Sequence, residues 1–106
     1  MTTHANTDAC MTACMECLAA CARCLDECIG SEAMAQCARL CRDCMVTCGA
    51  CATLCASNSQ NCGTLCRACA EICEACAAEC EKHDSEHCQE CARACRKCAE
   101  ECRKLQ

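Results

Sequence analysis

Cysteine recurs along this chain at alternating steps of four and three residues, and this spacing constrains the fold more than any other feature. Such an alternation places side chains along one narrow stripe of an α-helix. Each row of cysteines therefore predicts a helix with a single sulfur-bearing face. The first row is Cys10, Cys14, Cys17, Cys21, Cys24 and Cys28.

The row is repeated along the rest of the chain, which indicates an internal repeat. Two further rows keep the full spacing, whereas the last lacks one member because Asp84 stands four residues before Cys88. Four stripes predict four helices, at about residues 8–29, 32–56, 59–82 and 85–104. The later rows are Cys37, Cys41, Cys44, Cys48, Cys51 and Cys55, then Cys62, Cys66, Cys69, Cys73, Cys76 and Cys80, and finally Cys88, Cys91, Cys95, Cys98 and Cys102.

Short polar connections separate the rows and carry residues typical of helix ends. Gly30 suits a left-handed C-terminal cap. Ser57 with Gln60 fits a capping box, and Asp84 or Ser85 can cap the last helix. Connections this short make neighbouring helices antiparallel. We therefore predict an all-α protein, an up-down-up-down four-helix bundle with a cysteine-lined core, formed by residues 1–106 as one domain.

Composition limits the partners that such a chain can have. The 106 residues include 23 cysteines and no aromatic residue, and the net charge is −5 with acidic and basic residues interleaved. A nucleic acid or an anionic membrane requires a basic stripe, which is absent from the sequence. Neither a secretory signal nor a run long enough to span a bilayer is visible. We expect a cytoplasmic protein with no nucleic-acid and no membrane partner.

Three roles for so many cysteines can be compared. As small hydrophobic residues they would bury less apolar area than leucine or valine and would remain open to oxidation. A disulfide scaffold is disfavoured because the number of cysteines is odd, and because side chains at i and i+4 of one helix point in parallel directions. We therefore expect all the cysteines to be reduced thiols that face one interior and bind metal.

The charge of the bound ion separates the candidate metals. Zn(II) with four thiolates carries a net charge of −2, so an interior filled with separate zinc sites would bury many negative charges. Cu(I) prefers sulfur ligands and cancels one thiolate per ion. We predict storage of many Cu(I) ions, on the order of 20 per chain, in clamps such as Cys10 with Cys14. The alternative is a metallothionein-like protein that detoxifies Zn or Cd.

Two other classes fit the sequence less well. A thiol oxidoreductase uses a single C-x-x-C pair at a helix start beside a sheet, and no strand pattern occurs here. Iron–sulfur proteins usually carry a Cys-Pro pair, and this chain contains no proline. We predict that the protein is not an enzyme and that it delivers copper to cytosolic copper acceptors.

The segment 73–95, CEACAAECEKHDSEHCQECARAC, resembles the cytosolic bacterial branch of the copper storage protein family, with its pattern K-H-D-x-x-H-C at residues 82–88. The resemblance covers nearly the whole chain. It implies a cysteine-lined bundle that loads many Cu(I) ions and assembles as a homotetramer. The second helix carries more sulfur than the family implies, notably Cys41 and Cys48.

The predicted topology brings the first and third connections to one end of the bundle. Met34, His83, Asp84 and His87 would then lie near Cys28, Cys37, Cys80 and Cys88 and could form a copper entrance. The resemblance supports His83 and His87 as additional copper ligands, since imidazole also suits copper. The alternative is that both are solvent-exposed loop residues.

Three expectations concern the remaining surface. Apolar residues on the first two helices, together with Val46 opposite the cysteine stripe, indicate a subunit interface. We expect His4 to be a mobile terminal residue. We expect Asn58 to end a helix rather than to bind metal.

Overall fold

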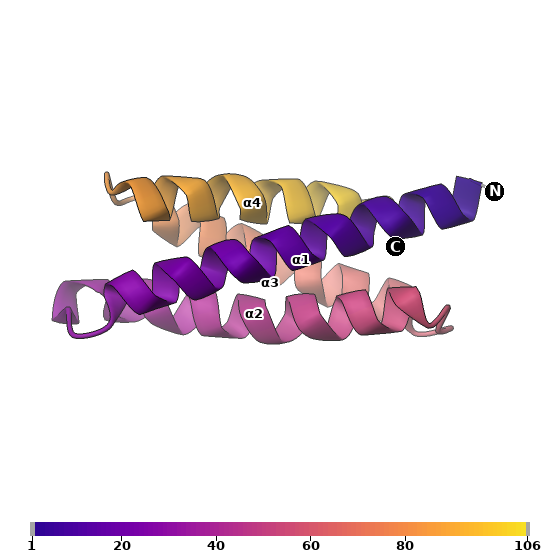
Figure 1. Cartoon of the computed structure of the whole chain (residues 1–106), viewed down its shortest axis with the longest axis horizontal. Coiled ribbons are helices and arrows are strands. Elements are labelled where there is room, and N and C mark those ends of the chain that lie inside the picture. The colour runs from indigo at the N-terminus through magenta and orange to yellow at the C-terminus, as the bar shows by residue number, and fades with distance from the viewer. Residues whose placement is uncertain (1, 106) are drawn as a thin grey trace.

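The protein is an elongated bundle of antiparallel helices, as predicted (Figure 1). The computed structural model describes the backbone of residues 2–105 and the side chains of residues 5–105, so the side chain of His4 lies outside the described residues. Within this range there are four α-helices and one short 3-10 helix, and no strand. The elements are α1 (Thr2–Cys28), η1 (Glu32–Met34), α2 (Ala35–Ala56), α3 (Cys62–Cys80) and α4 (Glu86–Arg103).

Three helix starts differ from the prediction by three residues or more. Helix α2 begins at Ala35 rather than near residue 32, because the 3-10 helix η1 occupies residues 32–34. Helix α1 begins at Thr2 rather than near residue 8, because no glycine or proline interrupts the segment before the first cysteine row. Helix α3 begins at Cys62 rather than near residue 59, because Asn58 adopts a left-handed conformation with φ 57° and the chain turns there. The expectation that Asn58 follows the end of α2 is confirmed.

The connections use fewer side-chain caps than the sequence indicates. The left-handed cap at Gly30 is confirmed, with φ 90°. The predicted capping box of Ser57 with Gln60 is wrong, because the Ser57 hydroxyl donates backwards to the Thr53 carbonyl at 3.0 Å. Ser85 precedes α4 as predicted, but its buried hydroxyl makes no hydrogen bond. Backbone turns rather than hydroxyl caps therefore end these helices.

Each helix packs against two neighbours, in the ring α1–α2–α3–α4–α1. The bundle measures 45 × 18 × 18 Å. Alanines such as Ala70, Ala77 and Ala99 lie buried beside the cysteine stripes and allow the helices to approach closely. No helix within residues 2–105 is long and apolar enough to cross a membrane. The four stripes therefore meet on the bundle axis, where the candidate site lies.

Candidate metal centre

Sulfur fills the interior of the bundle along its length. Every cysteine except Cys62 is buried, with an exposed fraction of 2 % or less, and Cys62 is half-buried. The stripes on α1, α2, α3 and α4 all point toward the axis, so the prediction that the rows share one interior is confirmed. Cys41 and Cys48 lie in this interior with the others, at 0 % exposure.

Several pairs of sulfur atoms four residues apart on one helix lie in contact. The Sγ atoms of Cys17 and Cys21 are 3.9 Å apart, and those of Cys69 and Cys73 are 3.8 Å apart. Two sulfurs on opposite sides of one ion, with bonds near 2.3 Å, would be about 4.6 Å apart. A small outward movement of either side chain therefore makes room for an ion within each such pair.

The shortest sulfur contacts join different helices, which the spacing within one row could not reveal. Cys44 Sγ on α2 lies 3.4 Å from Cys73 Sγ on α3, and Cys21 Sγ on α1 lies 3.5 Å from Cys91 Sγ on α4. Groups of four sulfurs lie within 4.8 Å of one another, for example Cys17, Cys21, Cys44 and Cys95 from three helices. Ions bound here would share sulfurs across helices as well as along them.

The protonation of the thiols depends on their place in the core. Burial raises the pKa of Cys24 and Cys28, and it raises the pKa of Cys37 to about 11. These thiols are neutral near pH 7, which lets them pack without a buried charge. A hydrogen bond with Cys102 lowers the pKa of Cys10 to about 5. Cu(I) must displace a proton from the first group and competes less with protons at Cys10.

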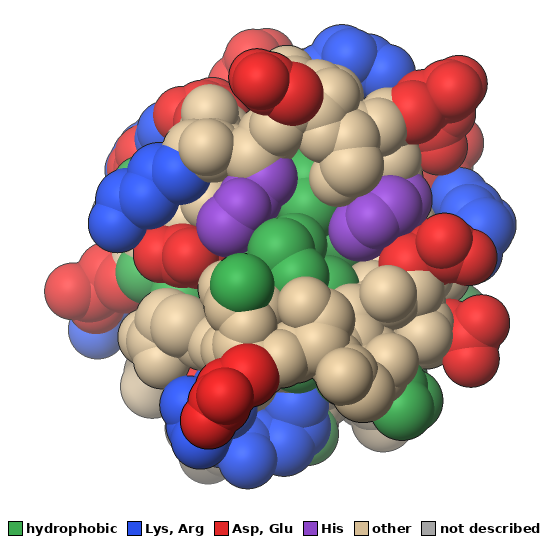
Figure 2. All heavy atoms as spheres, turned by 90° about the vertical axis from the view of Figure 1, so that its left-hand side faces the viewer, with side chains coloured by type: hydrophobic (Ala, Val, Ile, Leu, Met, Phe, Trp, Pro, Cys, Tyr) green, Lys and Arg blue, Asp and Glu red, His purple; other side chains and the backbone are tan. Residues whose placement is uncertain are grey.

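The two histidines of the α3–α4 connection lie at the same end of the bundle as the α1–α2 connection. His87 Nδ1 lies 3.3 Å from Cys24 Sγ and 3.6 Å from Cys88 Sγ. Figure 2 shows this end with the two histidines on either side of a hydrophobic patch, a class that includes cysteine. We call the part formed by Cys24, Cys28, Cys88, His83 and His87 the histidine end.

The structure separates the two histidines that the sequence grouped together. His83 Nε2 lies 3.1 Å from Glu79 Oε2, and the backbone carbonyl of His83 accepts a hydrogen bond of 2.7 Å from Gln89 Nε2. His87 is therefore turned toward sulfur, whereas His83 is turned toward a carboxylate. Met34 packs partly buried against the core, and Asp84 is exposed.

A surface hollow of about 410 Å³ lies between α1 and α4 beside His87. Its charged lining is mostly acidic and comes from Asp26, Glu27, Glu86 and Glu90, with Arg23. Carboxylates around a recess raise the local concentration of cations. The hollow therefore gives His87 an electrostatic surrounding that suits the approach of a metal ion.

One pair of cysteines corrects the expectation that every thiol is reduced. Cys55 at the end of α2 and Cys62 at the start of α3 form a disulfide, with a Cα–Cα distance of 5.2 Å. The parallel directions of side chains on one helix do not apply to a pair on two helices that a tight turn brings together. The remaining cysteines are free and buried.

The chain matches a family model described as copper storage protein over residues 3–106. It belongs to the copper storage protein family. The family resemblance that the sequence predicted is therefore confirmed, together with the cysteine-rich bundle fold of a copper storage protein. A comparison with curated protein sequences finds no match.

Solved structures of copper storage proteins resemble the chain over nearly its whole length. A Cu(I)-bound copper storage protein, BsCsp3, is 40 % identical with a TM-score of 0.90, covering 94 % of this chain and 97 % of its own. Metal-free copper storage protein 3 from Bacillus subtilis is 42 % identical with a TM-score of 0.89, covering 93 % and 97 %. A cytosolic copper storage protein from Streptomyces lividans with five coppers is 31 % identical with a TM-score of 0.90, covering 98 % and 94 %.

Proposed function

We propose that this copper storage protein holds Cu(I) in the cytoplasm, with its 23 cysteines as the set of ligands and with His83 and His87 as ligands at the histidine end. The observation that carries the proposal is the enclosed column of sulfurs, in which groups of four lie within 4.8 Å of one another. One relative from Streptomyces lividans is described as cytosolic with five coppers, which supports both the cargo and the compartment, and another is described as loaded with 10 copper equivalents, which supports the cargo.

The chemistry of the core favours Cu(I) over divalent metals. Each Cu(I) that replaces a thiol proton leaves the interior neutral, whereas Zn(II) with four thiolates adds a charge of −2 for each site. The interior lies away from water, so uncompensated charge there would be costly. The described core has no cationic side chain among its buried residues to balance it.

The geometry of the histidine end supports copper uptake there. His87 contacts Cys24 and Cys88 and lines an acidic hollow, so an ion could pass from carboxylates to imidazole and then to sulfur. His83 would first have to leave Glu79, so we assign the first binding step to His87. Cytosolic copper acceptors would remove copper from the same end.

Anaerobic titration of the fully reduced protein tests the storage proposal. We expect saturation at about 20 Cu(I) per chain, close to one ion per thiol. Titration with Zn(II) is the comparison. The protein should bind far fewer Zn(II) ions, and added Cu(I) should displace them. Saturation by Zn(II) at one ion per three or four thiols, resistant to Cu(I), would contradict the proposal.

The exposed apolar residues of α1 and α2 support assembly into a homotetramer. Val46 is 68 % exposed and Met15 is 52 % exposed on these helices. Large exposed apolar side chains on neighbouring helices favour burial against another subunit. Light scattering on the purified protein measures its mass in solution. A mass corresponding to one chain at micromolar concentration would contradict the proposal.

A further inference from the structure

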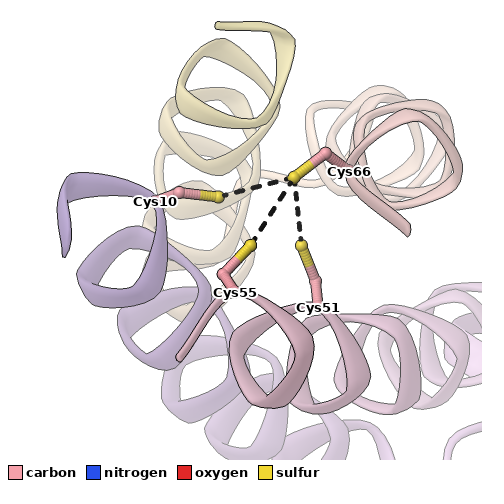
Figure 3. A group of neighbouring side chains, drawn as sticks. All are labelled: Cys10, Cys51, Cys55 and Cys66. Carbon is pink, nitrogen blue, oxygen red and sulfur yellow. Dashed lines mark hydrogen bonds between the residues drawn. The ribbon is translucent and has the colours of Figure 1, made fainter. Parts of the chain in front are cut away.

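The end of the core opposite the histidines joins sulfur atoms from three helices. Cys66 Sγ lies 4.0 Å from Cys10 Sγ, 3.5 Å from Cys51 Sγ and 3.8 Å from Cys55 Sγ, and Figure 3 shows these sulfurs pointing toward one another. Cys62 Sγ lies 3.9 Å from Cys66 Sγ. We call Cys10, Cys51, Cys55, Cys62 and Cys66 the disulfide end.

We propose that the Cys55–Cys62 disulfide controls the copper capacity of the disulfide end, by withdrawing two sulfurs from the set of ligands when oxidised and returning them when a small thiol reduces it. This inference rests on the proposed storage of Cu(I) by the core thiols. It assigns a regulatory role to one pair of sulfurs in that set.

Cys55 and Cys62 are placed to form a disulfide, whereas the cysteine pairs that flank the other two connections are not. Cys55 and Cys62 are the last cysteine of one row and the first of the next, separated by seven positions, with Cα atoms 5.2 Å apart. The corresponding pairs at the histidine end, Cys28 with Cys37 and Cys80 with Cys88, are joined by longer connections and remain free thiols. The left-handed Asn58 makes the α2–α3 turn tight enough to bring the two sulfurs together.

The disulfide is also the part of the sulfur core that solvent reaches. Cys62 is half-buried, whereas every other cysteine has an exposed fraction of 2 % or less. Cys55 lines a surface hollow of about 230 Å³ together with Asp8, Met11 and Asn58. A small thiol can therefore approach this pair without unfolding the bundle, while the axis beyond it stays enclosed.

The exchange follows ordinary thiol–disulfide chemistry. The thiolate of a low-molecular-weight thiol attacks Cys62 Sγ, so that a mixed disulfide forms and Cys55 leaves as a thiolate. A second small thiol attacks the sulfur of the first small thiol in the mixed disulfide, which releases Cys62 as a thiolate and forms a small-molecule disulfide. In total, one protein disulfide and two small thiols become two protein thiols and one small disulfide.

The consequence for copper follows from the charge balance. A disulfide sulfur carries no negative charge and cannot neutralise Cu(I), whereas each thiolate can. In the reduced state, Cys55 and Cys62 join the thiols of Cys10, Cys51 and Cys66. The sulfur of Cys66 lies within 4.0 Å of the other four sulfurs. Capacity should therefore rise by about two Cu(I) per chain on reduction, at about one ion per thiol.

The test compares Cu(I) capacity in two redox states of the same full-length protein. One sample is oxidised mildly with oxidised glutathione, the other is reduced fully, and both are freed of small thiols before anaerobic titration. Alkylation and peptide mass mapping identify the bonded pair. We expect Cys55–Cys62 as the first disulfide, about two fewer Cu(I) bound in the oxidised sample, and recovery after reduction.

Two variants separate the effect from a general loss of thiols. C55S/C62S should bind about two fewer Cu(I) in both samples, without a redox difference. The matched control C80S/C88S removes a hairpin pair at the histidine end, and it should keep the difference between the oxidised and reduced samples. Circular dichroism confirms that each variant is helical, and C62S alone serves as the second variant if the double variant does not fold.

Two outcomes would contradict the redox role of the disulfide, and a third would contradict the storage of Cu(I) on which that role rests. Equal capacities in a sample with a verified Cys55–Cys62 bond, or a first disulfide at another pair, would each reject the redox role. If the fully reduced protein does not take up many Cu(I) ions, the storage proposal fails instead.

Discussion

The two ends of the bundle are built from the same repeated row of cysteines but meet solvent through different chemistry. At the histidine end, an imidazole lies 3.3 Å from the Cys24 sulfur beside an acidic hollow. At the disulfide end, a tight turn joins two sulfurs of neighbouring rows. The difference teaches that the connections, rather than the repeated helices, decide what each end can do. Ligand exchange suits the first end, and thiol exchange suits the second.

The pH dependence of copper loading should show the largest effect. Burial raises the pKa of Cys24 and Cys28 and raises that of Cys37 to about 11, so these thiols are protonated throughout the range from pH 6 to pH 8. Binding of Cu(I) must release their protons, and the affinity therefore falls as the pH falls. We expect a loss on the order of 100-fold per displaced proton from pH 8 to pH 6, measured with a competing Cu(I) chelator.

Proton counting then separates the two ends. A hydrogen bond with Cys102 lowers the pKa of Cys10, so Cys10 competes less with protons than Cys37 does. Cys37→Ser should lower the number of protons released at saturation by about one per chain, whereas the matched variant Cys10→Ser should lower it less. Equal losses in a pH-stat titration would show that the ends do not differ in this way.

Removal of the sulfur-facing imidazole should have the next largest effect. His87→Ala should slow the uptake of Cu(I) on the order of tenfold, the effect of about 1.4 kcal/mol in the binding step, while the capacity changes by no more than about one ion. Stopped-flow transfer from a chelated Cu(I) donor measures the rate. His83→Ala is the control and should slow uptake less, since His83 contacts Glu79 rather than sulfur. Equal effects would contradict the distinct roles given to the two histidines.

The last comparison concerns the turns at the two ends, where substitutions should change the stability of the fold rather than the binding of copper. Gly30 has φ 90° and Asn58 has φ 57°, and an added Cβ at Gly30 would meet no atom within 4 Å. Gly30→Ala should therefore lower the free energy of unfolding by about 1–2 kcal/mol through conformation alone, because glycine has no Cβ and is not strained in the left-handed region. Asn58→Ala should lower it less, because asparagine has a Cβ and already bears part of this cost. Urea unfolding of the reduced, metal-free protein measures both. A larger loss at Asn58 would show that its side chain contributes more than its backbone conformation.

Much of the candidate site follows from the local pattern. The alternation of Cys10, Cys14 and Cys17 requires a helical stripe, and the repetition of that stripe requires a bundle, because a sulfur-lined face must pack against others like it. The pairing of Ser57 with Gln60 failed as a prediction because a capping motif competes with a backbone turn, here the left-handed turn at Asn58. Such competition depends on three-dimensional packing.

The sequence by itself determined that this protein has four cysteine-lined helices with their sulfurs in one interior, since periodicity alone fixes which face of a helix a residue occupies. Only the tertiary structure decided that Cys44 would meet Cys73, that His87 and not His83 would face sulfur, and that Cys55 would pair with Cys62. The physical reason is that these contacts depend on the register between helices and on the path of the connections. Both arise from packing over the whole bundle, which no spacing within a single row encodes.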